Sequence, residues 1–326
     1  MTGEHRVVVQ TRRLKYEFIL RRNITVIRGD SGTGKTTLVR LLAMYANDPN
    51  SGVDVQCDKK CIVYNDSYNG SAGDTLSRLK DSIIFIDEGQ KIIYSKEFAS
   101  IIKGTDNYYV LITRDPLKQL PYSISEIYGI RESSRYGGLN QTYNEIYNLY
   151  QSRDRKTGYK VDLDLIITED SNSGYEFFKH YCDMLGIRCV SAKGKSNILT
   201  LLGRFTEIRN VLAIVDGAAF GPEMEAVMKK VCKGDLKLYA PESFEWLLLK
   251  SGVVKEVPKD VLENPAKYIE SSEYFSWEQY FASVITKVTE GTPYKYSKHR
   301  LNRVYLLGAN IRKVIRTTGF LEMPKM

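Results

Sequence analysis

The sequence predicts an α/β protein with two domains, each built around a parallel sheet, and a helical C-terminal tail. Short apolar runs rich in β-branched residues alternate with stretches that have the apolar spacing of helices. This alternation occurs twice, before and after a polar segment, as expected for two consecutive α/β domains. The length of 326 residues also suits two domains of ordinary size.

The composition is that of a globular protein, since 43% of the residues are hydrophobic and 26% are charged. No apolar run approaches the roughly 20 residues that span a bilayer, so we expect no membrane partner. The N-terminal stretch, residues 1–13, lacks the apolar core of a signal peptide. The five cysteines are scattered and form no usual metal or redox spacing, which favours reduced thiols in a cytoplasmic protein.

The net charge of +8 is concentrated at the two ends of the chain. Residues 1–28 carry seven Arg or Lys against two acids, and residues 291–326 carry eight against one. Such basic ends attract the phosphate backbone of DNA or RNA. Solvated faces of an ordinary protein would account for the same charges. Both interpretations stay open.

A glycine-rich motif follows the third of three short strands, predicted at 6–10, 15–20 and 23–29. It matches G-x-x-x-x-G-K-[ST] at every fixed position and consists of Gly29, Asp30, Ser31, Gly32, Thr33, Gly34, Lys35 and Thr36. The next residues, 36–46, have the apolar spacing of a helix. A strand, a loop and a helix in this order are the context in which the motif binds nucleotide phosphates.

The chemistry of this loop suits a nucleoside triphosphate. Glycines allow backbone N–H groups to close around phosphates, and the start of the helix adds partial positive charge. We expect Lys35 to reach the β- and γ-phosphates, the Thr36 hydroxyl to ligate Mg²⁺, and Thr37 to complete the loop. ATP is favoured over GTP because the sequence has no NKxD-like guanine motif. A chance glycine-rich turn is the alternative.

A second part of a phosphate site is predicted in the stretch DSIIFIDEGQ. The continuous apolar run 83–86 is typical of a strand buried on both faces of a parallel sheet. Asp87, at the end of this run, would hold the Mg²⁺ shell, and Glu88 would polarise an attacking water. The alternative is a core strand that ends in two acids at the start of a helix.

A third buried strand is predicted at 108–115, after a helix at 95–104, and a further strand at 125–130. In parallel sheets with this loop, the strand beside it often ends in a polar residue that senses the γ-phosphate. Thr113 is the first candidate for this role and Arg114 the second. An ordinary polar residue at a strand end is an equally good interpretation of either.

The pattern over about residues 6–130 resembles the ATPase core of ABC-type and AAA-like P-loop proteins, and the resemblance rests on the two phosphate-site motifs. It departs from ABC transporters, because the stretch SYNGSAGDTLSRLK stands where an LSGGQ-like signature would precede the Asp87 strand. Dimers of the ABC type are therefore not implied. No trans-acting arginine is evident, and a homo-oligomer stays open.

Residues 1–150 are predicted to form the first domain, 151–162 a linker, 163–265 the second domain and 266–326 the basic helical tail. In the second domain strands and helices alternate, which implies βαβ units. The predicted elements are a strand at 163–170, a helix at 173–185, a strand at 187–192, a helix at 195–205, a strand at 210–221, a helix at 222–232 and a strand at 236–240.

Acids stand near the carboxyl ends of two of these strands: Glu169 and Asp170 after the first, and Asp216 after the third. Ligands of open α/β sheets bind at this edge, and hard divalent cations prefer carboxylate oxygens. We therefore expect these three residues to converge on one Mg²⁺. Caps of the following helices are the alternative role for acids at these positions.

The arrangement resembles the Toprim domain of topoisomerases, primases and the overcoming-lysogenization-defect nucleases. In that family a Glu closes the first strand and an Asp-x-Asp closes the third. The stretches GKSNILTLL and YAPESFEWLLL also resemble primase-like members and a related domain family of unknown function. A generic Rossmann-like domain remains the alternative.

Two departures from the Toprim pattern bear on activity. The family's Glu-Gly is Glu169-Asp170 here, and the second acid of the Asp-x-Asp is Ala218. Two-metal strand cleavage needs that further carboxylate. The resemblance therefore implies that Asp170, Glu223 or Glu242 substitutes for it, or that the domain is degenerate and does not cut.

The tail is predicted to contain helices at 271–290 and 297–319. Leu301, Val304, Tyr305, Ile311 and Ile315 suit a packed face. The basic residues left largely outside that face are Lys298, His299, Arg300, Arg303, Arg312, Lys313 and Arg316. Tyr294 and Tyr296 alternate with lysines, a mixture compatible with base stacking and phosphate contact. A solvated helical lid explains the same residues.

Together these features predict an Mg²⁺-dependent ATPase with Lys35, Glu88 and Thr113 as catalytic residues. By resemblance, its coupling to a Toprim-like domain implies nucleic-acid processing or phage defence. The alternative is a nucleotide-dependent switch or sensor, whose degenerate second domain binds a partner without cleaving it.

Overall fold

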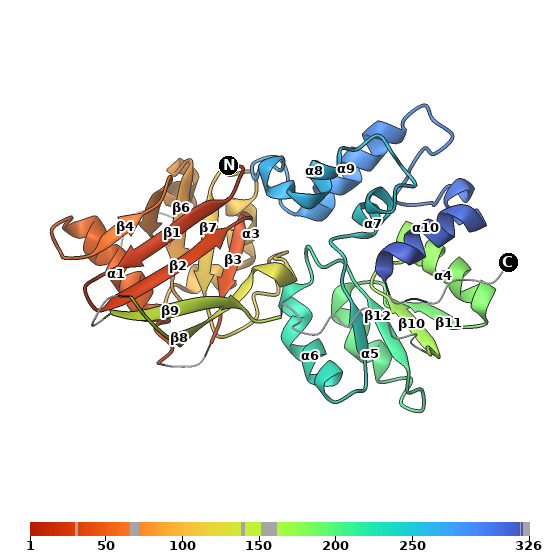
Figure 1. The fold of residues 1–326 in the computed structure, drawn as a ribbon, viewed down its shortest axis with the longest axis horizontal. Coiled ribbons are helices and arrows are strands. Elements are labelled where there is room, and N and C mark those ends of the chain that lie inside the picture. Colours follow the sequence, from red (N-terminus) through yellow and green to blue (C-terminus); the bar gives the residue numbers. More distant parts are fainter. Residues whose placement is uncertain (30–31, 66–71, 138–140, 151–161, 320, 322–326) are drawn as a thin grey trace. The chain divides into compact units, whose positions relative to one another are not determined.

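The protein has an α/β fold with one large mixed sheet and a separate parallel sheet (Figure 1). The computed structural model describes all residues except 30–31, 66–71, 138–140, 151–161, 320 and 322–326. The chain divides into two compact units. The first unit comprises Met1–Gln151 and Pro265–Ser276, and the second comprises Ser152–Asn264 and Trp277–Met326.

The sheet of the first unit has the strand order β4-β1-β2-β9-β8-β3-β7-β6-β5 in the described residues. Its strands are β1 His5–Gln10, β2 Leu14–Leu20, β3 Ile24–Ile27, β4 Asp54–Gln56, β5 Lys60–Val63, β6 Ser82–Ile86, β7 Tyr108–Ile112, β8 Ile127–Gly137 and β9 Gln141–Asn148. From β8 through β3, β7 and β6 to β5, every neighbouring pair is parallel. Strands β1 and β2, β1 and β4, and β8 and β9 pair antiparallel.

The β8–β9 hairpin corrects the sequence analysis, which ended the last strand of this unit at residue 130. Strand β8 continues to Gly137, and β9 follows it. The side chains of β9 are half-buried with one exception, so the strand lacks the apolar run by which a core strand is recognised. Cross-strand contacts stabilise it instead: Arg131 pairs with Glu145 at 2.9 Å and lies over the ring of Tyr147.

Helix α1 (Lys35–Asn47) begins directly after the glycine-rich loop, so the packing of this helix fixes the position of the loop. Its residues Leu38, Leu41 and Leu42 are buried in one core with Phe18 of β2 and Phe85 of β6. The helix also contacts both edge strands of the sheet, β4 and β5. Since only residues 57–59 separate these two strands, the sheet curls around α1. The other helices of this part are α2 Ala72–Arg78 and α3 Lys96–Ile102, with 3-10 turns at Lys91–Tyr94 and Ile124–Glu126.

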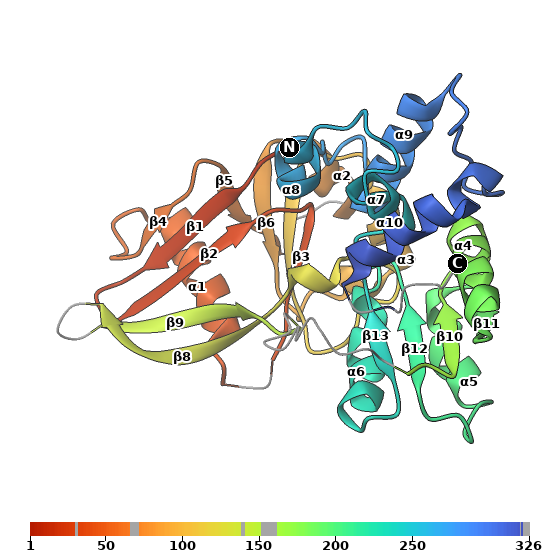
Figure 2. The same cartoon turned by 45° about the vertical axis from the view of Figure 1, so that its right-hand side comes forward.

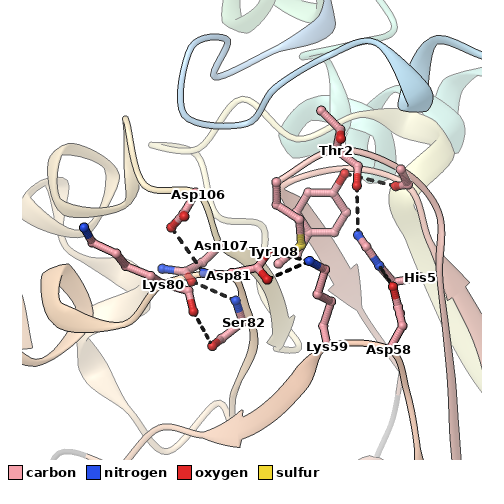
Figure 3. A network of polar contacts seen from close by, with 12 residues as sticks. Thr2, His5, Asp58, Lys59, Lys80, Asp81, Ser82, Asp106, Asn107 and Tyr108 are labelled. Atoms are coloured by element: carbon pink, nitrogen blue, oxygen red, sulfur yellow. Dashed lines mark hydrogen bonds and ion pairs between the residues drawn. The ribbon is translucent and has the colours of Figure 1, made fainter.

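A polar network joins the amino ends of β5, β6 and β7 (Figure 3). Lys59 pairs with Asp81 at 2.5 Å, and the N–H of Ser82 donates to Asn107 at 3.1 Å. The buried His5 lies 2.8 Å from Asp58 through its Nδ1 atom. These strands run away from the network, so their carboxyl ends lie at the opposite edge of the sheet. The network is therefore structural and separate from the acids Asp87 and Glu88.

The second unit contains a parallel sheet in the order β11-β10-β12-β13. The strands are β10 Leu165–Thr168, β11 Arg188–Ser191, β12 Val211–Ile214 and β13 Lys237–Tyr239. Its helices are α4 Ser173–Leu185, α5 Ile198–Leu202, α6 Met224–Cys232, α7 Phe244–Lys250, α8 Lys259–Glu263, α9 Trp277–Thr289 and α10 Gly308–Thr318, with 3-10 turns at Lys195–Asn197, Gly221–Glu223 and Arg303–Leu306. The predicted alternation of strands and helices, and the parallel sheet, are confirmed.

The predicted helical tail is divided between the two units. The segment Pro265–Ser276 belongs to the first unit, where the N–H of Ser271 donates to the carbonyl of Met1 at 3.1 Å. Helix α9 therefore begins at Trp277 and not at residue 271. Helix α10 is shorter than predicted, because residues 297–302 form no helix and Asn302 caps a separate 3-10 turn.

Helices α9 and α10 are part of the second unit, and α7 contacts both of them (Figure 2). None of the helices within the described residues is long and apolar enough to cross a membrane.

We expect Phe177→Ala to destabilise the second unit by about 3–5 kcal/mol, because it leaves a cavity in the core. Phe177 is fully buried, with its ring centroid 5.3 Å from that of Phe178 and 5.4 Å from that of Phe244. Urea unfolding followed by circular dichroism measures the change. Met184→Ala on the same helix is the control, because Met184 is exposed and its truncation should cost less than about 0.5 kcal/mol. Equal losses in the two variants would contradict this packing.

Candidate functional site

The parallel register of three neighbouring strands creates one polar edge in the first unit. Strand β7 lies between β3 and β6; the sequence analysis considered the strand at 108–115 only as a neighbour of the loop strand, and the order relative to β6 comes from the structure. Ile27 pairs with Ile112, and Leu111 pairs with Ile86. The three strands therefore end within one residue of each other. Two strand spacings, about 10 Å, separate the start of the glycine-rich loop from Asp87.

The backbone of the loop requires glycine. Gly32 and Gly34 have φ angles of 82° and 92°, in the left-handed region. A Cβ atom at Gly34 would lie 2.9 Å from the hydroxyl of Tyr16, which donates to the Gly34 carbonyl. Asp30 and Ser31 lie outside the described residues. The loop leads into α1, whose start has no side-chain cap and no acid in the first turn, so its first N–H groups suit an anion.

Lys35 folds back over this loop. Its Nζ donates to the carbonyl of Gly29 at 2.5 Å and to the hydroxyl of Thr33 at 3.2 Å. The side chain of Lys35 is buried, that of Thr36 is exposed and that of Thr37 is half-buried. The predicted loop residues therefore bring an ammonium group, a hydroxyl and helix N–H groups to one place. Such a set binds phosphate oxygens.

Asp87 and Glu88 lie at the same edge, directly after β6. Both are half-buried, and Asp87 Oδ1 accepts the N–H of Glu88 at 2.8 Å. Glu88 Oε1 pairs with Arg114 Nη2 at 3.0 Å. Arg28 Nη2 in turn donates to the carbonyl of Arg114 at 2.6 Å. The structure thus joins Arg114 to the carboxylate predicted to polarise water.

Arg28 is a residue that the sequence analysis missed. Its side chain is buried, and it links the end of β3 to the end of β7. A signal was present, because this arginine directly precedes the first glycine of the loop.

Thr113 has a different environment from the one predicted for a phosphate sensor. The side chain is fully buried, and its hydroxyl donates to the carbonyl of Asp115 at 3.0 Å. The same oxygen accepts the N–H of Asp115 at 3.1 Å and lies 2.9 Å from the hydroxyl of Tyr94. A hydroxyl has one donor and two acceptor sites, so these three contacts use its whole capacity. The guanidinium of Arg114, by contrast, is 55% exposed.

A second polar edge lies in the second unit, at the carboxyl ends of β10 and β12. Thr168 pairs with Ile214, and the N–H of Asp216 donates to Glu169 Oε2 at 3.0 Å. A small pocket at this edge is lined by Glu169, Asp170 and Asp216 among other residues. The three acids predicted to converge are therefore brought together.

Burial dominates the electrostatics of this pocket. It raises the pKa of Glu169 to about 7, and it also raises the pKa of Asp170. The pKa of Asp216 is raised well above its ordinary range, first by burial and then by the negative charges of Glu278 and Glu169. Carboxylates that resist ionisation in this way become ionised more easily when a cation is placed between them.

Two acids near the pocket were not predicted. Glu245 on α7 is buried and accepts the hydroxyl of Tyr296 at 2.7 Å, and Glu278 on α9 pairs with Lys298. Both add negative charge at Asp216. They lie on helices and not at strand ends, so no spacing in the sequence signals them. Lys195 opposes this charge: burial lowers its pKa, and its Nζ donates to the carbonyl of Ala219 at 2.9 Å.

The predicted roles of the strand-end acids differ between Asp170 and Glu169. Asp170 Oδ2 accepts the N–H of Asn172 at 3.2 Å, in the turn before α4. The N-cap of this helix is Asn172, which makes no side-chain cap bond. A Cβ atom at Gly174 would lie only 3.1 Å from the Asp170 carboxylate, which favours glycine there. The carboxylate of Glu169 accepts the N–H of Asp216 across the sheet.

Ala218 is not among the residues that line the pocket. It is 2% exposed, and its N–H donates to the carbonyl of Glu242 at 3.1 Å. The preceding Gly217 lies so close to the chain that its Cβ would be 2.8 Å from the Pro241 carbonyl oxygen. Of the substitutes considered from the sequence, Asp170 lines the pocket, whereas Glu223 contributes charge at Lys195.

The oxygen atoms of these side chains are of the type that binds a divalent cation, but their arrangement suits a complete ligand set less well. Carboxylate and hydroxyl oxygens are the ligands that Mg²⁺ prefers, and it commonly takes only one or two from the protein. In the described part of the chain, no three or more His, Cys, Asp or Glu residues are grouped as a metal-ligand set. Thr36 with Asp87, or Glu169 with Asp216, would thus each leave most ligand positions to water or substrate.

No protein-family model matches this chain, and no curated protein matches it either. The function is therefore argued from the geometry of the two polar edges.

We expect Glu169→Gln to flatten the pH dependence of stability. The pKa of Glu169 rises from an ordinary 4.5 to about 7 in the folded protein, so between these values the folded state binds more protons than the unfolded state. Stability of the wild type should therefore fall as pH rises through this window, and it should fall less in Glu169→Gln. Urea midpoints at pH 5 and pH 8 in EDTA measure the effect. Identical pH slopes in both proteins would contradict the burial of Glu169.

Proposed function

We propose that the first unit is an Mg²⁺-dependent P-loop ATPase and that the second unit is a Toprim-like domain acting on nucleic acid. The observation that carries the first part is the β3-β7-β6 order with its register, which brings the glycine-rich loop, Asp87–Glu88 and Arg114 to one edge. The sequence motifs that resemble ABC-type and AAA-like proteins would act together only in such an arrangement.

In this proposal the loop and α1 bind the triphosphate of ATP. The first N–H groups of α1 would donate to phosphate oxygens, and Lys35 would exchange its contact with the Gly29 carbonyl for the β- and γ-phosphates. Thr36 and Asp87 would hold Mg²⁺, which supplies positive charge to the phosphates.

Glu88 would act as the general base. Arg114 bonds its Oε1 atom, which fixes the carboxylate and leaves Oε2 to accept the proton of the attacking water. The exposed guanidinium of Arg114 would also stabilise charge on the transferred phosphoryl group. Thr113, engaged with Tyr94 and Asp115, would act indirectly by shaping the turn that carries Arg114.

For the second unit, Glu169 and Asp216 would hold a divalent cation at the sheet edge, with Asp170 beside them in the pocket lining and most ligand positions left to water or substrate. Their convergence and the raised pKa values of the carboxyls support this role. A Toprim-like domain coupled to an ATPase would suit nucleic-acid processing, including phage defence.

The second candidate is a nucleotide-dependent switch whose second unit binds a partner without cleaving it. The alanine at position 218 favours this candidate, because it supplies no carboxylate where the Toprim pattern has its second aspartate.

We expect Lys35→Ala to abolish ATP hydrolysis and Glu88→Gln to lower kcat by about 10²- to 10⁴-fold while ATP binding is kept. Phosphate release and binding of a fluorescent ATP analogue measure the two effects. Lys96→Ala is the matched control, since it removes an exposed lysine at the start of α3. Full activity in Lys35→Ala would overturn the proposed ATPase site.

We expect Mg²⁺- or Mn²⁺-dependent DNA cleavage to be lost in Glu169→Ala and kept in Lys35→Ala without ATP, if the second unit is a nuclease. Plasmid and linear DNA are incubated with each metal, with and without ATP. Glu207→Ala, which removes an exposed acid of the same unit, controls for charge. Absence of cleavage under all conditions, with ATPase activity intact, would contradict the nuclease and favour the switch.

A further inference from the structure

A continuous stretch of the second unit carries positive charge without any acid. Between residues 291 and 319 the sequence has seven Lys or Arg and no Asp or Glu. They are Lys295, Lys298, Arg300, Arg303, Arg312, Lys313 and Arg316. All are exposed except Arg312, which is half-buried. Within the described part of the chain, only Lys298 among them forms an ion pair, with Glu278.

The stretch is held rigidly on the unit and is not a loose tail. Tyr296 is buried, and its hydroxyl lies 2.7 Å from Ser173 Oγ and donates to Glu245 at 2.7 Å. The N–H of Ser173 donates to the carbonyl of Lys298 at 3.1 Å. The basic residues around position 298 are therefore fixed to the start of α4.

Helix α10 is anchored in the same way by its apolar face. Ile311, Val314 and Ile315 are fully buried, which leaves Lys313 and Arg316 exposed on the opposite side. The charges are thus preorganised, and a partner would lose little conformational entropy in ordering them.

The stretch begins beside the acidic pocket. Ser173, which holds Lys298, is followed by Gly174, a residue that lines the pocket with Glu169 and Asp216. Lys298 also pairs with Glu278, whose charge acts on Asp216. An anionic polymer bound along the basic residues would therefore lead toward the pocket.

We propose that residues 295–316, which we term the cationic surface, bind the phosphate backbone of duplex DNA and bring a phosphodiester to the pocket at Glu169 and Asp216. This inference rests on the nucleic-acid role proposed for the second unit and names its substrate as a duplex. Most cations of this surface are exposed and, apart from Lys298, form no ion pair in the described residues, which is what backbone binding requires.

The tyrosines of this stretch favour a duplex over a single strand. Tyr296 and Tyr305 are buried, and the hydroxyl of Tyr305 donates to the carbonyl of Tyr294 at 2.6 Å. Of the three tyrosines only Tyr294 is partly exposed, so the stretch offers few ring faces on which successive unpaired bases would stack, although base stacking was considered from the sequence. The major groove of B-form DNA admits a helix such as α10, whereas that of A-form RNA is too deep and narrow.

A membrane fits the cationic surface less well than DNA. Leu307 is the one large exposed apolar side chain within residues 291–319. Stable attachment to a lipid surface needs buried apolar area in addition to charge.

The test uses the full chain with the substitutions Arg312→Glu, Lys313→Glu and Arg316→Glu, and a fluorescent 25-base-pair DNA duplex without metal or ATP. Anisotropy is measured over a series of NaCl concentrations. We expect at least tenfold weaker binding at low salt and a decrease of about 2–3 in the slope of log K against log salt, because about 0.9 is lost per phosphate contact.

The matched control reverses the charge of three other lysines by substitution with Glu. They are Lys229, Lys230 and Lys233, which are exposed at the end of α6 in the same unit. We expect its affinity and salt slope to equal those of the wild type. A neutral variant with Gln at positions 312, 313 and 316 should show an intermediate loss, and it keeps the proposal testable if charge reversal prevents folding.

Three results would overturn the proposal: equal weakening by the α6 control, no weakening by either α10 variant, or tighter binding of single-stranded DNA or duplex RNA than of duplex DNA. Binding is measured without metal or nucleotide and repeated in Lys35→Ala, whose substitution lies in the first unit. The readout therefore does not depend on ATP hydrolysis or DNA cleavage, and the failure of either proposal can be told from the other.

Discussion

The hydrogen-bond register of β3, β7 and β6 is the constraint on which the candidate ATP site depends. Because Ile27 faces Ile112 and Leu111 faces Ile86, the strands end together. A slip of one residue would turn Asp87 and Arg114 to the other face of the sheet. Such a slip would require every side chain of β6 and β7 to repack, since each position of these strands is buried.

Strand register also brings distant residues together in the second unit, where burial in addition raises the pKa of the acids. The register of β10 and β12 brings Glu169 beside Asp216. Helices α7 and α9 then add Glu245 and Glu278, whose charges act on Asp216. Ionising several carboxyl groups that are buried close together costs free energy unless a cation balances their charge. This cost is the physical reason to associate the pocket with a cation.

Several local features could be predicted and others could not, for reasons that particular residues illustrate. The loop from Gly29 to Thr36 and the apolar run before Asp87 are local patterns, so the sequence contains them in full. The β8–β9 hairpin was missed because Arg131, Glu145 and Tyr147 stabilise it through contacts between strands and not through an apolar run. Thr113 shows a related limit: its position at a strand end was predicted, but its three hydrogen bonds depend on Tyr94 and Asp115.

The sequence by itself determined the α/β class and the order of most strands and helices, and it contained the candidate residues for phosphate and metal binding. Periodicity and short motifs are sufficient for these, because they are properties of neighbouring residues. The tertiary structure alone decided which distant groups meet: Arg114 with Glu88, Tyr296 with Ser173, and Glu278 with Lys298. It also showed the basic tail to be a fixed surface, since Tyr296, Tyr305 and the isoleucines of α10 are buried and most of its cations are exposed. Such contacts join residues far apart in the chain, and no local spacing encodes them.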